Sequence, residues 1–188
     1  MNRRLRAYLA ATLALVLCLT LACAAPIMPQ RSKPGGAARW ADSVARQRAI
    51  EWARDAELCH VSGSGVGIDG WLPDRGGTWQ LVYWSPGKTA VLQVAVDSDG
   101  KPRSQERRAT PQRGHSLPAL WSDSPKAWAA TRTHQKGEPL STFDAELGLD
   151  ADGEHFPGQV VWRIRFWLPE NAYETHVVSP EAKWLLSY

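Results

Sequence analysis

Two short segments with the same pattern constrain the fold more than any other feature of this chain. Residues 79–84 read WQLVYW and residues 162–167 read WRIRFW. Because side chains alternate between the two faces of a β-strand, each segment predicts a strand with three large apolar residues on one face and its last Trp on the other. The segments begin 83 positions apart, at Trp79 and Trp162. This spacing suggests an internal duplication.

Three further matches follow in the same order, at offsets of 81, 81 and 82 positions. They are WADS at 40–43 with WSDS at 121–124, VGID at 66–69 with LGLD at 147–150, and AVDSDGK at 95–101 with VVSPEAK at 177–183. Four short matches in one order are stronger evidence than any one of them. We therefore predict two tandem units, over residues 40–100 and 121–188.

The residues around the Trp strands complete each unit. Apolar residues recur at helical spacing from Ala45 to Ala56, which predicts a helix over residues 43–56, and Pro125 starts a second helix that ends near Gln135. Each unit thus reads helix, strand, strand, strand, and the apolar end of the chain is expected to continue the last strand into the sheet. We predict an α+β fold in which two tandem helix-strand-strand-strand repeats form an antiparallel sheet, with the helices packed on one face.

The first 22 residues predict a secretory signal peptide. Three arginines precede an apolar run from Ala7 to Ala22, the arrangement that export leaders share. Removal of residues 1–22 takes three of the 22 basic residues and none of the 19 acidic ones, which leaves a formal net charge of zero. The remaining chain lacks the basic excess of nucleic-acid-binding domains, so we expect no nucleic-acid partner.

The end of the leader fits two processing routes. Residues 19–23, LTLAC, resemble a bacterial lipoprotein box, in which Cys23 becomes N-terminal and lipidated after cleavage. Acyl chains on Cys23 would anchor the protein in a membrane, and Ala24 after the cysteine implies the outer membrane, facing the periplasm. Residues 22–24, ACA, also fit an ordinary signal-peptidase site, which would release a soluble periplasmic or secreted protein. Both routes lead to the bacterial cell envelope or beyond it.

Two segments are predicted to lie outside the packed units. Residues 23–39 hold three prolines and two glycines, a composition typical of a flexible tether. Residues 101–120 carry five basic residues, one acidic residue and three prolines, which predicts a solvated basic connector. The alternative for this connector is a docking surface for an acidic partner or for anionic lipid.

The first unit has a helix followed by three strands and a late V-x-V-D-x-x-G turn at residues 94–100. In an exported chain, this arrangement resembles a module of the PepSY family. The resemblance spans residues 40–188. Members occur in protease propeptides and as free periplasmic or lipoprotein domains, sometimes in tandem. The resemblance implies a module that inhibits or chaperones another protein rather than catalysing a reaction. Other small helix-plus-sheet folds, including cystatin-like ones, fit the same pattern.

Residues suited to catalysis or metal binding are few. Cys59 and His60 are a thiol and an imidazole adjacent in sequence, but neighbours on a strand point to opposite faces, so we expect Cys59 to be a small half-buried residue. Residues 150–154, DADGE, faintly resemble a calcium loop but lack the ligands of a complete one, and a solvated acidic hairpin is the expected structure. We expect no catalytic residue, no metal site and no cofactor.

The last Trp of each hexapeptide is a sharper candidate for function. Trp84 and Trp167 fall on the face opposite the core residues, and Arg163 and Arg165 flank the second of them. Exposed aromatic side chains beside Arg are typical of protein-binding surfaces, although a loop or the other unit could cover this face. We predict a partner-binding set of Trp84, Arg163, Arg165 and Trp167.

These features together predict a non-catalytic binding module of the cell envelope, attached to the membrane through lipid on Cys23. Its partner would be another envelope or secreted protein, in an inhibitor, chaperone or immunity role. The alternatives are a structural envelope lipoprotein and a small hydrolase that uses Cys59. Nothing in the sequence indicates a particular oligomeric state.

Overall fold

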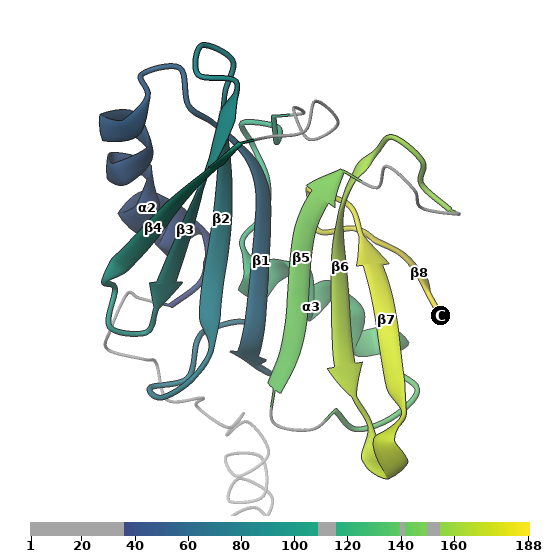
Figure 1. The fold of residues 1–188 in the computed structure, drawn as a ribbon. Coiled ribbons are helices and arrows are strands. Elements are labelled where there is room, and N and C mark those ends of the chain that lie inside the picture. The colour runs from purple at the N-terminus through teal and green to yellow at the C-terminus, as the bar shows by residue number, and fades with distance from the viewer. Residues whose placement is uncertain (1–35, 109–115, 140–141, 150–154) are drawn as a thin grey trace, which may run out of the picture. The chain divides into compact units, whose positions relative to one another are not determined.

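The computed structural model describes residues 36–108, 116–139, 142–149 and 155–188. Over these ranges the chain forms two α-helices and one eight-stranded antiparallel sheet (Figure 1), which confirms the α+β class. The leader and Cys23 lie outside the described residues. No helix in the described part of the chain is long and apolar enough to cross a membrane.

We refer to residues 36–108 as the first half and to residues 116–188 as the second half. The elements of the first half are α2 (Ala38–Trp52), β1 (Glu57–Gly67), β2 (Thr78–Ser85), β3 (Ala90–Asp97) and β4 (Pro102–Arg108). Those of the second half are α3 (Ser124–Thr131), the 3-10 helix η2 (Arg132–His134), β5 (Thr142–Leu149), β6 (Val160–Trp167), the 3-10 helix η3 (Pro169–Asn171), β7 (Tyr173–Val178) and β8 (Trp184–Ser187).

The two halves meet in the middle of one continuous sheet. The strand order is β4-β3-β2-β1-β5-β6-β7-β8, so each half runs outward from its own first strand. The central pair β1 and β5 is antiparallel, with Val61 opposite Leu147 and Val66 opposite Phe143. Figure 1 shows this order from the teal strands of the first half to the yellow strands of the second.

The core lies between the sheet and its two helices. As predicted, three residues of each Trp strand point into it and are at most 1% exposed; they are Trp79, Leu81 and Tyr83 of β2 and Trp162, Ile164 and Phe166 of β6. Helix α2 contributes buried alanines at helical spacing, including Ala41, Ala45 and Ala49, whereas α3 contributes Ala127 and Trp128. Small residues let α2 lie close to the sheet, and the large ring of Trp128 fills the space under the shorter helix.

Helix α2 begins and ends earlier than the sequence indicates, at Ala38 and Trp52 rather than near residues 43 and 56. Its first N–H groups are capped by the second half: Ala38 N donates to Ser124 Oγ at 3.0 Å, and Arg39 N donates to Asp123 Oδ1 at 2.9 Å. A cap from 86 residues away leaves no local signal in the sequence. The predicted tether over residues 23–39 was therefore wrong for residues 36–39, and residues 23–35 lie outside the described part of the chain.

The prediction of a solvated connector over residues 101–120 was also wrong in part. Residues 102–108 form β4, an edge strand that pairs with β3 along its whole length. The strand lacks apolar alternation because all its residues after Pro102 are exposed, and charged side chains with a proline are typical of a sheet edge. Residues 116–120 form neither helix nor strand, and residues 109–115 are outside the described ranges.

The predictions for the second half hold more closely. Asp123 accepts a hydrogen bond from Ser124 N at 2.8 Å as the N-cap of α3, Pro125 lies in the first turn, and the helix continues into η2 as far as His134. The end of the chain enters the sheet but does not continue the last strand as expected, because it turns back as a separate strand, β8, that pairs antiparallel with β7. The sheet therefore gains a fourth strand in each half, β4 and β8, where the sequence indicated three.

Only some of the matched sequence segments occupy corresponding positions. Trp79 pairs with Val96 and Trp162 pairs with Val178, so the Trp strands and the strands that follow them correspond. The other two matches do not: Asp42 lies inside α2, whereas Asp123 precedes α3. Similarly, the β5 partner of Trp162 is Leu147, whereas the β1 partner of Trp79 is Gly63 rather than Val66.

Candidate functional site

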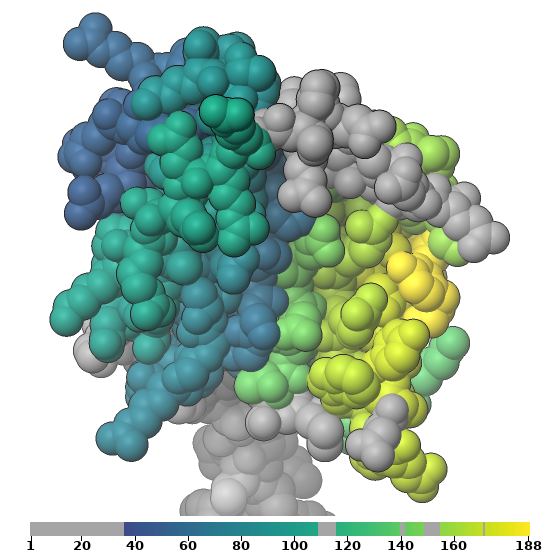
Figure 2. Space-filling model, viewed as in Figure 1, coloured from purple at the N-terminus to yellow at the C-terminus, as the bar shows by residue number. Residues whose placement is uncertain are grey.

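One face of the sheet is covered by α2 and α3, and we call the opposite face, which neither of these two helices covers, the outer face. Figure 2 shows strands of both halves side by side on this surface. Because residues alternate along each strand, the neighbours of the core residues point to the outer face. On β2 and β6 these neighbours include all four residues predicted to bind a partner, Trp84, Arg163, Arg165 and Trp167.

Two exposed aromatic rings and an arginine form a compact group at one end of the outer face, which we call the aromatic patch (Arg165, Trp167 and Tyr173). Trp167 and Tyr173 are paired residues at the end of the β6–β7 hairpin and are 44% and 57% exposed. Their ring centroids lie 5.8 Å apart at 70°, and the Arg165 guanidinium lies 5.3 Å from the centre of the Tyr173 ring. Edge-to-face packing and a cation–π contact hold the three side chains in one arrangement.

The aromatic patch adjoins a row of mixed charge. On β5 and β6, Asp144 lies opposite Arg165 and Glu146 lies opposite Arg163. Glu146 Oε1 is also 3.7 Å from His60 Nε2 on β1. Opposite charges on neighbouring strands stabilise the pairing, and this part of the outer face is neither mainly positive nor mainly negative. A partner that binds here must therefore match both aromatic rings and alternating charges.

Trp84 does not join the aromatic patch. Trp84 lies opposite Glu57, the first residue of β1. Trp167 is next to Phe166, whose partner on β5, Phe143, lies opposite Val66 near the other end of β1. Strand β1 runs for 11 residues, and at about 3.3 Å per residue the two Trp positions are separated by about 30 Å along the strands. The four residues predicted as one binding set thus form two separate places on the outer face.

Trp84 instead packs against a small apolar cluster made of Cys59, Val82 and Val91. The expectation that Cys59 and His60 face opposite sides of the sheet was wrong, because a bulge interrupts the register between Leu58 and His60. The two side chains still diverge. Cys59 Sγ donates to Val82 O on β2 at 3.2 Å, while the His60 ring lies over Gly148 on β5, where a Cβ would come within 2.6 Å of Nδ1.

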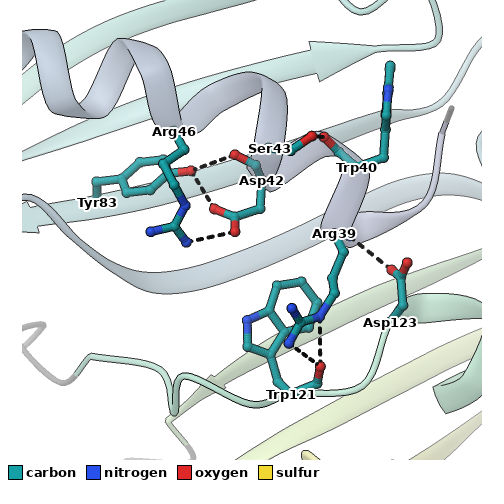
Figure 3. A network of polar contacts seen from close by, with 8 residues as sticks. All are labelled: Arg39, Trp40, Asp42, Ser43, Arg46, Tyr83, Trp121 and Asp123. Carbon is teal, nitrogen blue, oxygen red and sulfur yellow. Dashed lines mark hydrogen bonds and ion pairs between the residues drawn. The ribbon is translucent and has the colours of Figure 1, made fainter.

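A partly buried polar network joins α2 to the sheet in the first half (Figure 3). The Tyr83 hydroxyl donates to Asp42 Oδ1 at 2.7 Å, and Arg46 Nη2 donates to Asp42 Oδ2 at 2.7 Å. Burial and the neighbouring Asp42 carboxylate raise the pKa of Tyr83, so the phenol stays protonated and remains a donor. Both oxygens of a nearly buried carboxylate are therefore satisfied.

The helix ends of the two halves meet beside this network. Arg39 Nε and Nη2 both donate to Trp121 O, at 2.9 and 2.7 Å, and the guanidinium lies 4.7 Å from the centre of the Trp121 ring. Figure 3 shows Arg39 reaching from α2 to Trp121 and Asp123. Ser124 adds a second link, since its Oγ donates to Gly70 O at 2.7 Å and accepts from Ala38 N. These contacts tie the halves together on the helix side of the sheet.

The second half has a different buried polar group, on β7. Glu174 and His176 are 4% and 0% exposed, and His176 Nε2 lies 3.0 Å from Glu174 Oε1. His176 Nδ1 accepts a hydrogen bond from Trp184 Nε1 on β8 at 3.2 Å, and Glu174 Oε2 accepts one from Lys136 N at 3.1 Å. Burial lowers the pKa of His176, against the opposing effect of Glu174. No pattern in the sequence indicated this pair.

Within the described ranges, no three or more His, Cys, Asp or Glu side chains are grouped so that they could hold a metal ion. The faint calcium-loop pattern at residues 150–154 lies outside those ranges.

Comparison of the chain with protein-family models, with curated proteins and with solved structures returned no match. The site must therefore be interpreted from its own residues.

Proposed function

We propose that this chain is a non-catalytic binding module of the bacterial cell envelope, which recognises another envelope or secreted protein through the aromatic patch. The observation that carries the proposal is the exposed group Arg165, Trp167 and Tyr173 on the sheet face that neither α2 nor α3 covers. Trp, Tyr and Arg are the residues most enriched among binding hot spots. Because the three side chains already hold one another, binding would require little further ordering.

The leader and Cys23 support the cellular side of the proposal, in which the module is exported and anchored to the outer membrane by lipid, or released as a soluble protein. The resemblance to PepSY modules supports an inhibitor, chaperone or immunity role. Its turn motif coincides with the β3–β4 hairpin, where Gly100 N donates to Asp97 O at 3.0 Å and Gly100 has a φ of +72°. A structural envelope lipoprotein without a stoichiometric partner is the competing function.

We further propose that the two halves arose by duplication of one unit made of a helix and antiparallel strands. The support is the common pattern of the two Trp strands, 83 positions apart, and the mirrored strand order on either side of β1 and β5. Under this proposal Trp84 and Trp167 descend from one position, and only the second became part of an exposed patch.

Affinity co-purification from detergent-solubilised envelopes, followed by mass spectrometry, tests the binding proposal. We expect a near-stoichiometric protein with the wild type and with Trp84→Ala, and its loss with the double variant Trp167→Ala/Tyr173→Ala. Circular dichroism checks that both variants are folded. The proposal is wrong if the wild type retains nothing beyond background, or if the double variant retains the same protein as the wild type.

A further inference from the structure

The buried pair on β7 is not required by the fold. Glu174 and His176 pair with Phe166 and Ile164 of β6. The corresponding residues of the first half, which pair with Tyr83 and Leu81 of β2, are Leu92 and Val94. Apolar residues therefore fill the same two positions in the other half of the sheet. Burial of an ionisable pair is costly compared with apolar packing, so the pair needs a reason other than stability.

The contacts of His176 define its protonation state. Its Nδ1 accepts a hydrogen bond from Trp184 Nε1, so Nδ1 carries no proton and the neutral ring has its proton on Nε2, which faces Glu174. Nε2 and Glu174 Oε1 are 3.0 Å apart but lack the alignment of a hydrogen bond, and neither has another hydrogen-bond partner among the described residues. The ring also stacks on Phe166, with centroids 5.3 Å apart.

We propose that Glu174, His176 and Trp184 form an acid-sensitive lock that holds β8 on β7. A proton taken from solvent binds His176 Nδ1 and converts that atom from an acceptor into a donor. The Trp184 N–H then faces another N–H, the hydrogen bond is lost, and the edge strand β8 is released more readily. The proposal does not depend on the proposed binding function, because it concerns the attachment of β8 alone.

The charged groups around the ring are consistent with release below neutral pH. Desolvation lowers the pKa of His176 from 6.5, Glu174 on β7 opposes this shift, and His134 of η2 and Lys136 after it lower the pKa further. His134 also stacks on Trp184, with centroids 3.8 Å apart and planes at 7°. The folded protein therefore keeps His176 neutral until the pH falls below the ordinary value for histidine, where the lock opens.

Hydrogen exchange measured by mass spectrometry tests the lock, with the opposite edge strand β4 as internal reference. We expect protection of the amides of β8 to fall by about fivefold more than that of β4 between about pH 7.5 and about pH 5, after correction for intrinsic exchange, because loss of one ordinary hydrogen bond has this effect. The double variant Glu174→Leu/His176→Val copies Leu92 and Val94 and should abolish the difference between the strands.

Two further variants keep the test decisive. Trp184→Phe removes the donor and keeps a ring against His134, so it should lower protection of β8 at neutral pH and remove the extra acid response. His134→Phe removes the other imidazole and should keep that response but shift it to higher pH, because His134 lowers the pKa of His176. The lock is wrong if β8 and β4 lose protection equally in the wild type, if Trp184→Phe or the double variant keeps the response, or if His134→Phe abolishes it.

Discussion

The two halves of the sheet place their buried polar groups in different positions on closely similar strands. In the first half the polar group joins a helix to the sheet, where Asp42 of α2 accepts from Tyr83 of β2. In the second half Phe166 takes the place of Tyr83, and the polar pair Glu174–His176 lies on the next strand instead. The network around Asp42 is fully satisfied, whereas the pair on β7 keeps atoms without a hydrogen bond. The same arrangement of strands therefore accommodates a buried polar group at either position.

The largest effect on stability is expected at the feature that the two halves share, the buried Trp. Trp79→Ala and Trp162→Ala should each lower the free energy of unfolding by about 3–5 kcal/mol, because both rings are 0% exposed and leave large cavities. Urea unfolding followed by far-ultraviolet circular dichroism measures the loss. Since β1 and β5 join the halves in one sheet, each variant should still unfold in one transition. Two separate transitions in either variant would contradict a single cooperative core.

A smaller loss of stability is expected when a polar residue of the first half is replaced by its apolar counterpart in the second. Tyr83→Phe copies Phe166 of the second half and removes the hydroxyl that donates to Asp42 Oδ1 at 2.7 Å. The free energy of unfolding should fall by about 1–3 kcal/mol, since a nearly buried carboxylate oxygen loses its donor. Tyr173→Phe is the matched control, because that ring is exposed, and it should change stability by less than about 0.5 kcal/mol. Equal effects of the two variants would show that Asp42 does not need Tyr83.

A smaller effect is expected where the halves meet. Ser124→Ala removes both the acceptor for Ala38 N and the donor to Gly70 O, so α2 loses one of its two capping contacts from the second half and keeps the one from Asp123. We expect a loss of about 0.5–2 kcal/mol in the free energy of unfolding. Ser122→Ala serves as the control, because Ser122 makes its contacts with Pro180 and Trp162 through its backbone. A loss as large for Ser122→Ala would argue against capping by Ser124.

The smallest effect on stability should come from the aromatic patch. Trp167→Ala is expected to change the free energy of unfolding by no more than about 0.5 kcal/mol, because the ring is exposed and packs mainly on Tyr173. Trp84→Ala should cost more, because Trp84 is half-buried against Cys59 and Val82. Thermal unfolding of the two variants compares them directly. A larger loss for Trp167→Ala would mean that its ring supports the fold rather than a binding surface.

The features that could be predicted from the sequence are those set by local periodicity. The two Trp strands, the direction of their core residues, the turn at residues 97–100 and the start of α3 at Pro125 all leave a pattern within a few residues. Arg165 and Trp167 of the patch were identified for the same reason. Each of these features depends on residues nearby in the sequence and not on contacts with distant segments.

The missed features depend on contacts between distant segments. Strand β4 is charged on both faces and is recognisable as a strand only through its pairing with β3. The start of α2 depends on Ser124, and the bulge at Cys59 depends on the register with β2. Tyr173 joins the patch, and His176 reaches Trp184, because the strands pair in one particular register. That register is fixed by the whole strands and the turns between them, not by the few residues around Tyr173 or His176.

One measurement tests most directly whether the polar pair of the second half serves a pH response rather than stability: the free energy of unfolding of the wild type and of Glu174→Leu/His176→Val, from about pH 8 to about pH 5. The pKa of His176 is lower in the folded chain than its usual 6.5. The unfolded chain therefore binds the proton more readily, and acid favours unfolding.

We expect the double variant to be at least as stable as the wild type at the upper end of this range, since apolar residues occupy the corresponding positions of the first half. As the pH falls below 6.5, the wild type should lose stability relative to the variant, so the gap between them widens. A double variant that is markedly less stable near pH 8 and follows the same pH dependence as the wild type would show that the polar pair serves stability and not a pH response.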